Sequence, residues 1–192
     1  MQKFISDKTL INETVERLNN FLPYDRIYIT TTTNYAEKIR TLLPDIPKEN
    51  IVVEPIARGT TAALALVNAT IYQHDNEASI FYLASDHAVT DVVAFQRTLA
   101  ETFDYIADNP KQIALVGIKP TRPDTGLGYI KLKKLIQTDP VVYSVDRFVE
   151  KPSYEVAEKY VESGEYYWNA AYYCFKAKTL LEAYKDADSI IT

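Results

Sequence analysis

The sequence predicts an α/β fold with a Rossmann-like, mostly parallel sheet and helices on both of its faces. Extended apolar stretches alternate along the chain with helical stretches, an order that favours parallel strands joined by right-handed crossovers. The run Ser79–Ala84 (SIFYLA) is almost continuously apolar, which is typical of a strand covered on both faces. With 192 residues, of which 47% are hydrophobic, the chain is long enough to bury a core without disulfide or metal staples.

In the first part of the chain, cap residues and apolar periodicity define the helices. Asp7 or Thr9 is expected to cap a helix that continues to Leu22, and Asn34 a second helix that stops before Pro44. Two further helices are expected at about residues 60–72, which are rich in alanine, and at about 92–107, which are amphipathic. Short runs of β-branched, aromatic and apolar residues predict strands at Arg26–Thr31, Ile51–Glu54, Ser79–Ala84 and Gln112–Ile118.

The pattern changes after Pro120. Residues Tyr129–Lys134 alternate apolar and polar side chains and Val142–Val149 form a second extended run, which indicates antiparallel strands. Further elements are expected as a helix capped by Ser153 and reaching about Ser163, a strand at Ala171–Phe175 and a helix at Leu180–Tyr184. We therefore expect one domain, with an α/β core at about residues 1–120 and a β-rich section at about 121–192.

The charge balance and the cysteine count exclude several classes of protein. Lys and Arg number 21 against 26 Asp and Glu, and the net charge of −5 argues against a nucleic-acid-binding surface. The sequence has no apolar run of membrane-spanning length, and its start lacks the apolar core of a signal peptide. The single cysteine, Cys174, fits the reducing cytoplasm. Two histidines and one cysteine, far apart, exclude a Cys/His zinc cluster, so that a metal ion would need oxygen ligands.

Polar residues and glycines gather where the expected strands end. Ligands of open α/β sheets bind beyond the carboxyl ends of the strands, so these positions are candidates for a site. Glycines 126 and 128, two residues apart, would allow a ligand to approach the backbone closely. The candidates are, in chain order, Glu54, Arg58, Gly59, Thr60, Asp86, Gly128, Glu150, Lys151 and Asn169.

Five motifs in this order resemble the sugar-phosphate nucleotidylyltransferases, and most closely the mannose-1-phosphate guanylyltransferases. They are EP-x-x-R-x-T at 54–60, SDH at 85–87, KPTRPDTGLGYI at 119–130, VDRFVEKP at 145–152 and GEYYWN at 164–169, and together they cover nearly the whole chain. The resemblance implies that mannose 1-phosphate attacks the α-phosphorus of GTP, which gives GDP-mannose and pyrophosphate. It also implies Mg²⁺, a hard cation that bridges phosphate oxygens and needs carboxylate ligands.

The same resemblance implies roles for single residues. Asp86 takes the position of the metal-binding and catalytic aspartate; the alternative is that it only caps a helix near Asp91 or starts a turn. Lys151 would neutralise the sugar phosphate during catalysis, and Glu150 would accept hydrogen bonds from sugar hydroxyls, unless the two are simply a solvated pair at a strand end. Asn169 and the backbone of Gly128 would also contact the sugar.

On the nucleotide side, Glu54 and Arg58 match positions around the base and ribose. We hypothesise that the Glu54 carboxylate accepts from the amino group and ring N–H of guanine; the alternative is a surface acid. Gly59 stands where the family usually has asparagine, and its N–H remains available to the base. Thr60 would either bind the nucleotide or only cap the following helix.

Several features depart from the family pattern. Leu127 replaces a common tyrosine, and Ala170 and Ala171 replace a Ser-Gly pair, so that another sugar-1-phosphate nucleotidylyltransferase is an alternative. The glycine-rich GG-x-GTRL loop after the first strand, and a later region with a second metal-binding aspartate, are absent. We therefore expect an incomplete catalytic domain, without transferase activity and marginally stable, in which strands next to the missing one lack partners.

The competing class of function is a non-catalytic module that binds nucleotide sugars without the phosphate loop. A homodimer is possible for the full-length protein. His87 is expected to make an orienting hydrogen bond at most, and Cys174 to be a buried strand residue and not a nucleophile.

Overall fold

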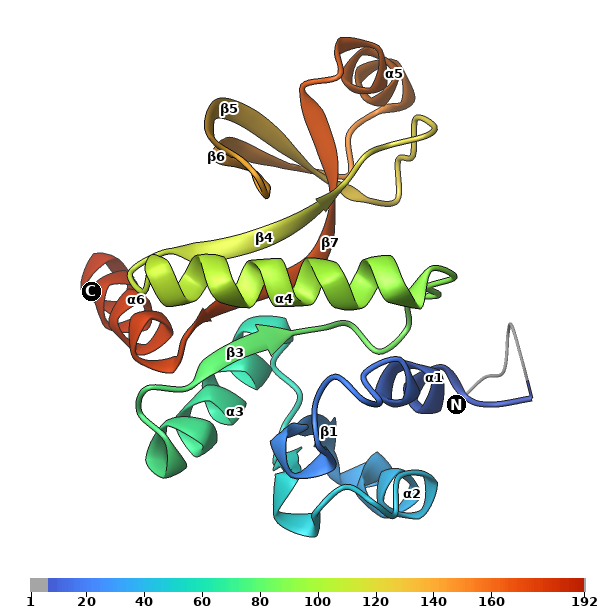
Figure 1. Ribbon diagram of the computed structural model, residues 1–192, viewed down its shortest axis with the longest axis vertical. Coiled ribbons are helices and arrows are strands. Elements are labelled where there is room, and N and C mark those ends of the chain that lie inside the picture. Colours follow the sequence, from blue (N-terminus) through green and yellow to red (C-terminus); the bar gives the residue numbers. More distant parts are fainter. Residues whose placement is uncertain (1–6, 192) are drawn as a thin grey trace. The chain divides into compact units, whose positions relative to one another are not determined.

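The computed structural model describes residues 7–191 (Figure 1). The chain forms two compact units. The first unit contains the chain up to Ile113 together with the part from Cys174 onward, and the second unit is Ala114–Tyr173. None of the helices in the described part of the chain is long and apolar enough to cross a membrane.

The first unit contains most of the helices. Its helices are α1 (Leu10–Glu16), α2 (Thr33–Leu42), α3 (Thr60–His74), α4 (Val92–Asp108) and α6 (Ala177–Ile191), with 3₁₀ turns at Tyr24–Arg26 and Lys48–Asn50. Its strands are β1 (Ile29–Thr32), β2 (Ile51–Glu54) and β3 (Ser79–Tyr82). Nine buried residues from α1, α2, α4 and the neighbouring strands and loops form its core: Ile11, Val15, Leu18, Ile27, Ile39, Leu43, Ile46, Ile51 and Leu99.

The second unit is mainly antiparallel. It holds nearly all of β4 (Ile113–Ile118), then β5 (Gly128–Thr138), β6 (Val141–Glu150), α5 (Tyr154–Ser163) and most of β7 (Tyr166–Lys176), whose last residues belong to the first unit. Strand β5 pairs antiparallel with β6 along its length and with β7 at Tyr129–Lys131. A small core of Tyr129, Ala157 and Tyr166 lies beneath α5, and Tyr160 stacks on Tyr166 with ring centroids 3.7 Å apart.

The strands form two sheets. Strands β1 and β2 make a parallel pair, and the other strands form a five-stranded sheet with the order β3-β7-β5-β6, in which β4 also pairs with β7. The predicted α/β class with parallel and antiparallel strands is confirmed, but the sheet is not continuous. Within residues 7–191, β1 pairs only with β2 and β3 only with β7, so each keeps one edge without a strand partner.

A large cavity lies beside these two edges. It measures about 1140 Å³ and is lined by residues of β1, including Ile29 and Thr31, and of β3, including Ile80 and Tyr82. Side chains of α1 also line it, among them Thr14. The cavity is thus lined by strands of both sheets.

Several element boundaries differ from the sequence expectation. Helix α1 ends at Glu16 and not at Leu22, because the next bonds, such as Leu18 N–H to Val15 O, close tighter turns before Asn20 adopts a φ of 64°. Strand β1 begins at Ile29, since Tyr24–Arg26 form a 3₁₀ turn. Asn34 does not cap α2, which already begins at Thr33.

Candidate functional site

Asp86 lies in the turn that follows β3, in the first unit. Its side chain is 78% exposed, and the ring Nε2 of His87 is 3.9 Å from its Oδ1. Asp86 does not cap α4, because Asp91 does so by accepting a 2.9 Å hydrogen bond from the Ala94 N–H, but Asp86 does lie in a turn, as the other half of that alternative has it. An exposed carboxylate at the carboxyl end of a strand is available to a ligand.

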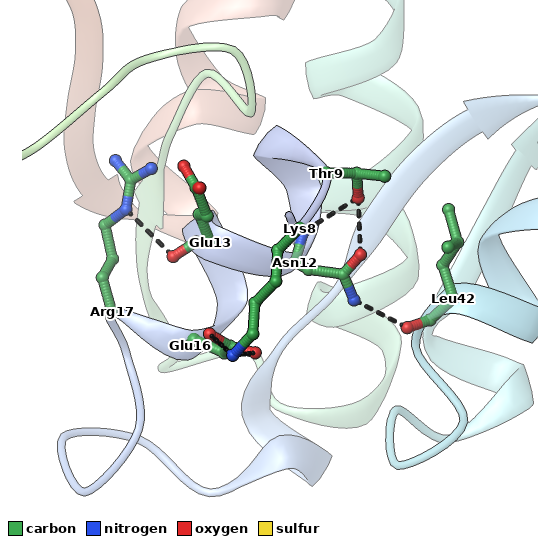
Figure 2. Close-up of polar contacts among 7 residues, drawn as sticks. All are labelled: Lys8, Thr9, Asn12, Glu13, Glu16, Arg17 and Leu42. Atoms are coloured by element: carbon green, nitrogen blue, oxygen red, sulfur yellow. Dashed lines mark hydrogen bonds and ion pairs between the residues drawn. The ribbon is translucent and has the colours of Figure 1, made fainter. Parts of the chain in front are cut away.

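The turn that carries Asp86 is held in place by α1. The Arg17 side chain donates to the backbone oxygen of His87 at 2.6 Å, and Thr14 Oγ1, whose proton goes to the Leu10 oxygen at 2.8 Å, lies 3.4 Å from the backbone oxygen of Ser85. Helix α1 is itself joined to the end of α2, since Asn12 Nδ2 donates to the Leu42 oxygen at 2.8 Å, as Figure 2 shows. Asp86 is thus presented from a fixed backbone.

Arg17 makes contacts behind the Asp86 turn that the sequence did not reveal. It is only 5% exposed, its guanidinium donates to Thr14 Oγ1 at 3.0 Å, and it lies over the Phe95 ring. Figure 2 shows that it also donates to the Glu13 backbone oxygen, at 3.3 Å. Its own backbone oxygen accepts from Gln96 of α4 at 2.8 Å. In the sequence, the spacing of three residues between Thr14 and Arg17 could have indicated that the two side chains share the face of α1 that packs on the core.

The donor chemistry near Asp86 fits Mg²⁺ in part. Among residues 7–191, no group of three or more His, Cys, Asp or Glu side chains is arranged to hold a metal ion. Mg²⁺ in nucleotide enzymes is commonly held by one or two carboxylates together with phosphate oxygens and water. Asp86 therefore fits one ligand of a magnesium–phosphate complex, and it does not form a metal site by itself.

The connection from β2 to α3 carries the remaining nucleotide candidates. Glu54 is the last residue of β2 and lies opposite Thr32 of β1, while Arg58 and Thr60 are exposed. The helix cap is Gly59 and not Thr60, which is the first residue of α3, and no side chain bonds to the helix start. Gly59 has φ 85° and ψ 177°, a conformation that essentially only glycine adopts.

In the second unit, the structure brings together the residues predicted to contact the sugar phosphate. Gly128 lies opposite Glu150 on β5 and β6, and a Cβ atom at Gly128 would lie 2.7 Å from Glu150 Oε2 and 3.6 Å from the Asn169 Cβ. Lys151 Nζ is 3.6 Å from Glu150 Oε1. We call Gly128, Glu150, Lys151 and Asn169 the Glu150 cluster. It combines a carboxylate, an ammonium, an amide and a glycine whose missing side chain makes room for that carboxylate.

The backbone of this cluster is strained. Of the described residues other than glycine, three have φ in the left-handed region, and two of them, Lys151 (44°) and Ala171 (54°), lie in or beside the Glu150 cluster. Such conformations cost about 1–3 kcal/mol each and gather at functional sites. Ala171 keeps this conformation while its N–H donates to Asn169 Oδ1 at 3.0 Å. The amide of Asn169 is thereby oriented by a backbone turn.

In the loop 119–127 before β5, Arg122 and Asp124 form an ion pair that was not predicted. Arg122 Nη2 donates to Asp124 Oδ2 at 2.6 Å, and Asp124 Oδ1 accepts from the Gly126 N–H at 2.9 Å. The Gly126 N–H and the Arg122 guanidinium hold the pKa of Asp124 below its ordinary value, and partial burial opposes them. The pairing of opposite charges two residues apart was the sequence signal.

Cys174 is fully buried on β7, as predicted. Burial raises the pKa of its thiol to about 12. A thiol at this pKa is almost entirely protonated near neutral pH, so the expectation that Cys174 is not a nucleophile agrees with its surroundings.

The chain resembles known proteins along nearly its whole length. Residues 2–192 match the family model described as nucleotidyl transferase. Proteins named mannose-1-phosphate guanylyltransferase from Escherichia coli K12 and Salmonella typhimurium LT2 are 36% and 37% identical over 186 residues. Both alignments cover 93% of this chain and 38% of the relative, so the chain spans well under half the length of these curated relatives.

A solved structure gives the same picture of the fold. The crystal structure described as mannose-1-phosphate geranyltransferase from Thermus thermophilus superposes with a TM-score of 0.77 and 29% sequence identity. The match covers 93% of this chain and 50% of that chain.

Proposed function

Because the chain belongs to the nucleotidyl transferase family, we propose that it acts in the transfer of the guanylyl group of GTP to mannose 1-phosphate. In this reaction a phosphate oxygen of mannose 1-phosphate forms a bond to the α-phosphorus of GTP. The bond from that phosphorus to the bridging oxygen of the β-phosphate breaks, and pyrophosphate leaves. The products are GDP-mannose and pyrophosphate.

The observation that carries the proposal is the Glu150 cluster. Lys151 extends an exposed ammonium that would neutralise the sugar phosphate, both on binding and as charge develops during transfer. The Glu150 carboxylate and the Asn169 amide supply acceptors and donors for sugar hydroxyls. Gly128, which has no side chain, leaves room for the Glu150 carboxylate beside the strand. The four residues belong to a section of about residues 121–192, which we propose as the sugar-phosphate-binding part.

On the nucleotide side, we propose a binding part at about residues 1–120. The Glu54 carboxylate would accept from guanine, and Arg58, the Gly59 N–H and Thr60 would contact the nucleotide at the start of α3. Mg²⁺, when bound by Asp86 and phosphate oxygens, would supply positive charge to the triphosphate. Asp86 would orient that complex from a turn whose backbone Arg17 holds. The one cysteine fits a cytoplasmic location for this reaction.

A second candidate keeps the chemistry but changes the sugar. Ala170 and Ala171 stand where relatives carry Ser-Gly, next to Asn169, and Leu127 stands beside Gly128 in place of tyrosine. A methyl group in place of a hydrogen narrows a pocket, and such differences change specificity by about 1–3 kcal/mol. The alternative is therefore a nucleotidylyltransferase for another sugar 1-phosphate.

Binding experiments on the chain test the proposal. Calorimetric titrations would compare mannose 1-phosphate with glucose 1-phosphate, and GTP with ATP, CTP and UTP in the presence of Mg²⁺. We expect mannose 1-phosphate and GTP to bind most tightly, and Lys151→Met to weaken sugar-phosphate binding about tenfold through loss of a charge-assisted contact. Lys133→Met, which removes an exposed lysine of β5 outside the cluster, is the matched control.

The outcomes separate the candidate functions. A preference for glucose 1-phosphate would favour the second candidate. Binding of nucleotide sugars without turnover in a full-length relative of this chain would favour the non-catalytic module. Absence of sugar-phosphate binding to the folded chain would contradict the proposed role of the Glu150 cluster.

A further inference from the structure

The loop 119–127 is fastened to strand β7 by one arginine. The guanidinium carbon of Arg122 lies 5.2 Å from the centroid of the Trp168 ring, and its Nη2 is 2.6 Å from Asp124 Oδ2. A planar guanidinium can stack on an aromatic face and pair with a carboxylate at the same time, which an ammonium group does less well. Arg122 thus joins an indole ring on β7 to a carboxylate within the loop.

Asp124 in turn links the loop to the start of β5. Its carboxylate accepts from the Gly126 N–H, and its backbone N–H donates to the Tyr129 hydroxyl at 3.0 Å. The same hydroxyl donates to the Asp124 backbone oxygen at 2.9 Å, and Tyr129 is completely buried. The loop is therefore tied to a residue that cannot move without disturbing the core of the second unit.

Both ends of this connection adjoin the Glu150 cluster. Tyr129 follows Gly128 in β5 and lies opposite Trp168 in the β5–β7 register. Trp168 in turn precedes Asn169. A change in the loop would consequently shift Gly128 and Asn169, two members of the cluster, relative to Glu150.

We propose that Arg122 is a positioning residue, which holds the loop 119–127 against Trp168 and thereby sets the geometry of the Glu150 cluster on which sugar-phosphate affinity depends. The inference rests on the proposed function for its substrate, a sugar 1-phosphate. It does not require Arg122 to touch that substrate, although the Arg122 side chain is 65% exposed. Direct contact between Arg122 and the phosphate is the competing explanation. Only a positioning role predicts that substitution of Arg122 changes the surroundings of Trp168 in the absence of ligand.

Trp168 provides the test, because it is the only tryptophan in the chain. Its emission wavelength and its quenching by acrylamide report on the indole face that Arg122 covers. We would measure both, without ligand, in the wild-type chain, Arg122→Ala, Arg122→Lys and Asp124→Asn. Arg97→Ala is the control, since Arg97 is an exposed arginine of α4 in the first unit that pairs only weakly, at 3.8 Å, with Glu101.

We expect Arg122→Ala to shift the emission to the red and to increase quenching, and Asp124→Asn to do so to a lesser extent. Mannose 1-phosphate affinity should fall about tenfold in Arg122→Ala, the combined effect of a lost cation–π contact and a lost ion pair. In emission, quenching and affinity, Arg122→Lys should lie between the wild type and Arg122→Ala, and Arg97→Ala should match the wild type. Circular dichroism and thermal melting of each variant establish that it is folded.

Three results would overturn the inference. The first is unchanged emission and quenching in Arg122→Ala. The second is a change in emission with unchanged sugar-phosphate affinity. The third is reduced affinity with unchanged emission and quenching, which would assign Arg122 to direct phosphate contact. If the wild-type chain does not bind mannose 1-phosphate, the proposed function fails, and titration with other sugar 1-phosphates then decides whether Arg122 positions a different substrate or none.

Discussion

Gly128 and Glu150 lie directly opposite each other on β5 and β6, so close that a Cβ atom at Gly128 would come within 2.7 Å of Glu150 Oε2. The absence of a side chain at position 128 therefore determines where the Glu150 carboxylate rests. Because the conflicting atom is at the end of a flexible side chain, a methyl group can be accommodated by moving the carboxylate.

We predict that Gly128→Ala leaves stability within about 0.5 kcal/mol of the wild type but weakens sugar-phosphate binding about tenfold. The physical reason is displacement of an acceptor for sugar hydroxyls, not loss of packing. Thermal unfolding and calorimetric titration measure the two effects. In a double-mutant cycle, Gly128→Ala should have no further effect on binding once Glu150 is Ala, and additive losses would contradict the explanation.

At Ala171, by contrast, we predict a substitution that stabilises the protein. Its φ of 54° lies in the left-handed region, where an alanine costs about 1–2 kcal/mol and a glycine nothing. Part of that gain is offset by the greater freedom of glycine in the unfolded chain, about 0.4–1 kcal/mol. We therefore predict that Ala171→Gly raises the free energy of unfolding by about 0.5–1 kcal/mol.

Ala170→Gly is the matched control for Ala171→Gly. Ala170 is buried in the same strand and is not among the residues with positive φ, so glycine should destabilise it by about 0.5–1 kcal/mol. Urea unfolding of both variants gives the comparison. Destabilisation by Ala171→Gly equal to that by Ala170→Gly would show that backbone strain at position 171 is not the controlling factor.

Arg17 links stability to the position of Asp86. Arg17→Met keeps the length of the side chain but leaves the backbone oxygen of His87 and the hydroxyl of Thr14 without this donor. Hydrogen bonds from a charged donor contribute about 1.5–3 kcal/mol, and we predict a loss of stability in that range. We also predict weaker Mg²⁺-dependent binding of GTP, because the turn with Asp86 loses its anchor.

The control for this variant is Arg97→Met, an exposed position where the expected change is within about 0.5 kcal/mol. Chemical unfolding and GTP titration with and without Mg²⁺ provide the measurements. If Arg17→Met lowers stability but leaves Mg²⁺-dependent GTP binding intact, then Arg17 has only a structural role.

Because the pKa of Asp124 is lowered in the folded chain, we predict that the free energy of unfolding depends on pH in the acid range. Its pKa is lowered from 3.8, chiefly by the Gly126 N–H, so the unfolded chain binds a proton at this group more readily than the folded chain. The stabilising contribution is therefore complete above pH 3.8 and is lost as the pH falls through the lower folded value. The stability difference between the wild type and Asp124→Asn should shrink below that pH, and a constant difference between about pH 5 and pH 2.5 would contradict this.

The sequence predicted those parts of the molecule that depend on local pattern. The strand at Ile51–Glu54 has the expected bounds, and α3 and α4 begin at the expected residues, Thr60 and Val92, because a short apolar run or an amphipathic period is set by neighbouring side chains. The residues of the Glu150 cluster were picked out by their motifs, and the structure places them together, while their roles stay predictions.

Longer-range interactions account for what the sequence did not reveal. Strand β7 begins at Tyr166 and not at Ala171, because its pairing with β5 at Tyr166–Trp168 extends it. The roles of Arg17 and Arg122 depend on partners 70 and 46 positions away in the chain, His87 and Trp168, which no local period indicates. The break between the two sheets likewise follows from which strands meet, not from the strength of any strand signal.

Cys174 offers a direct measure of how β7 opens. Its thiol is fully buried and burial raises its pKa to about 12, so at pH 8 only about one thiol in 10⁴ is ionised, against roughly a quarter for a free cysteine. We predict that a thiol reagent such as dithiobis-nitrobenzoate modifies the native chain only through opening of the structure around β7. The labelling rate should therefore rise with urea in step with unfolding followed by circular dichroism, and Cys174→Ser should abolish labelling altogether. Rapid labelling of the native chain, independent of urea, would mean that β7 is exposed at position 174 and would contradict the buried position of this strand.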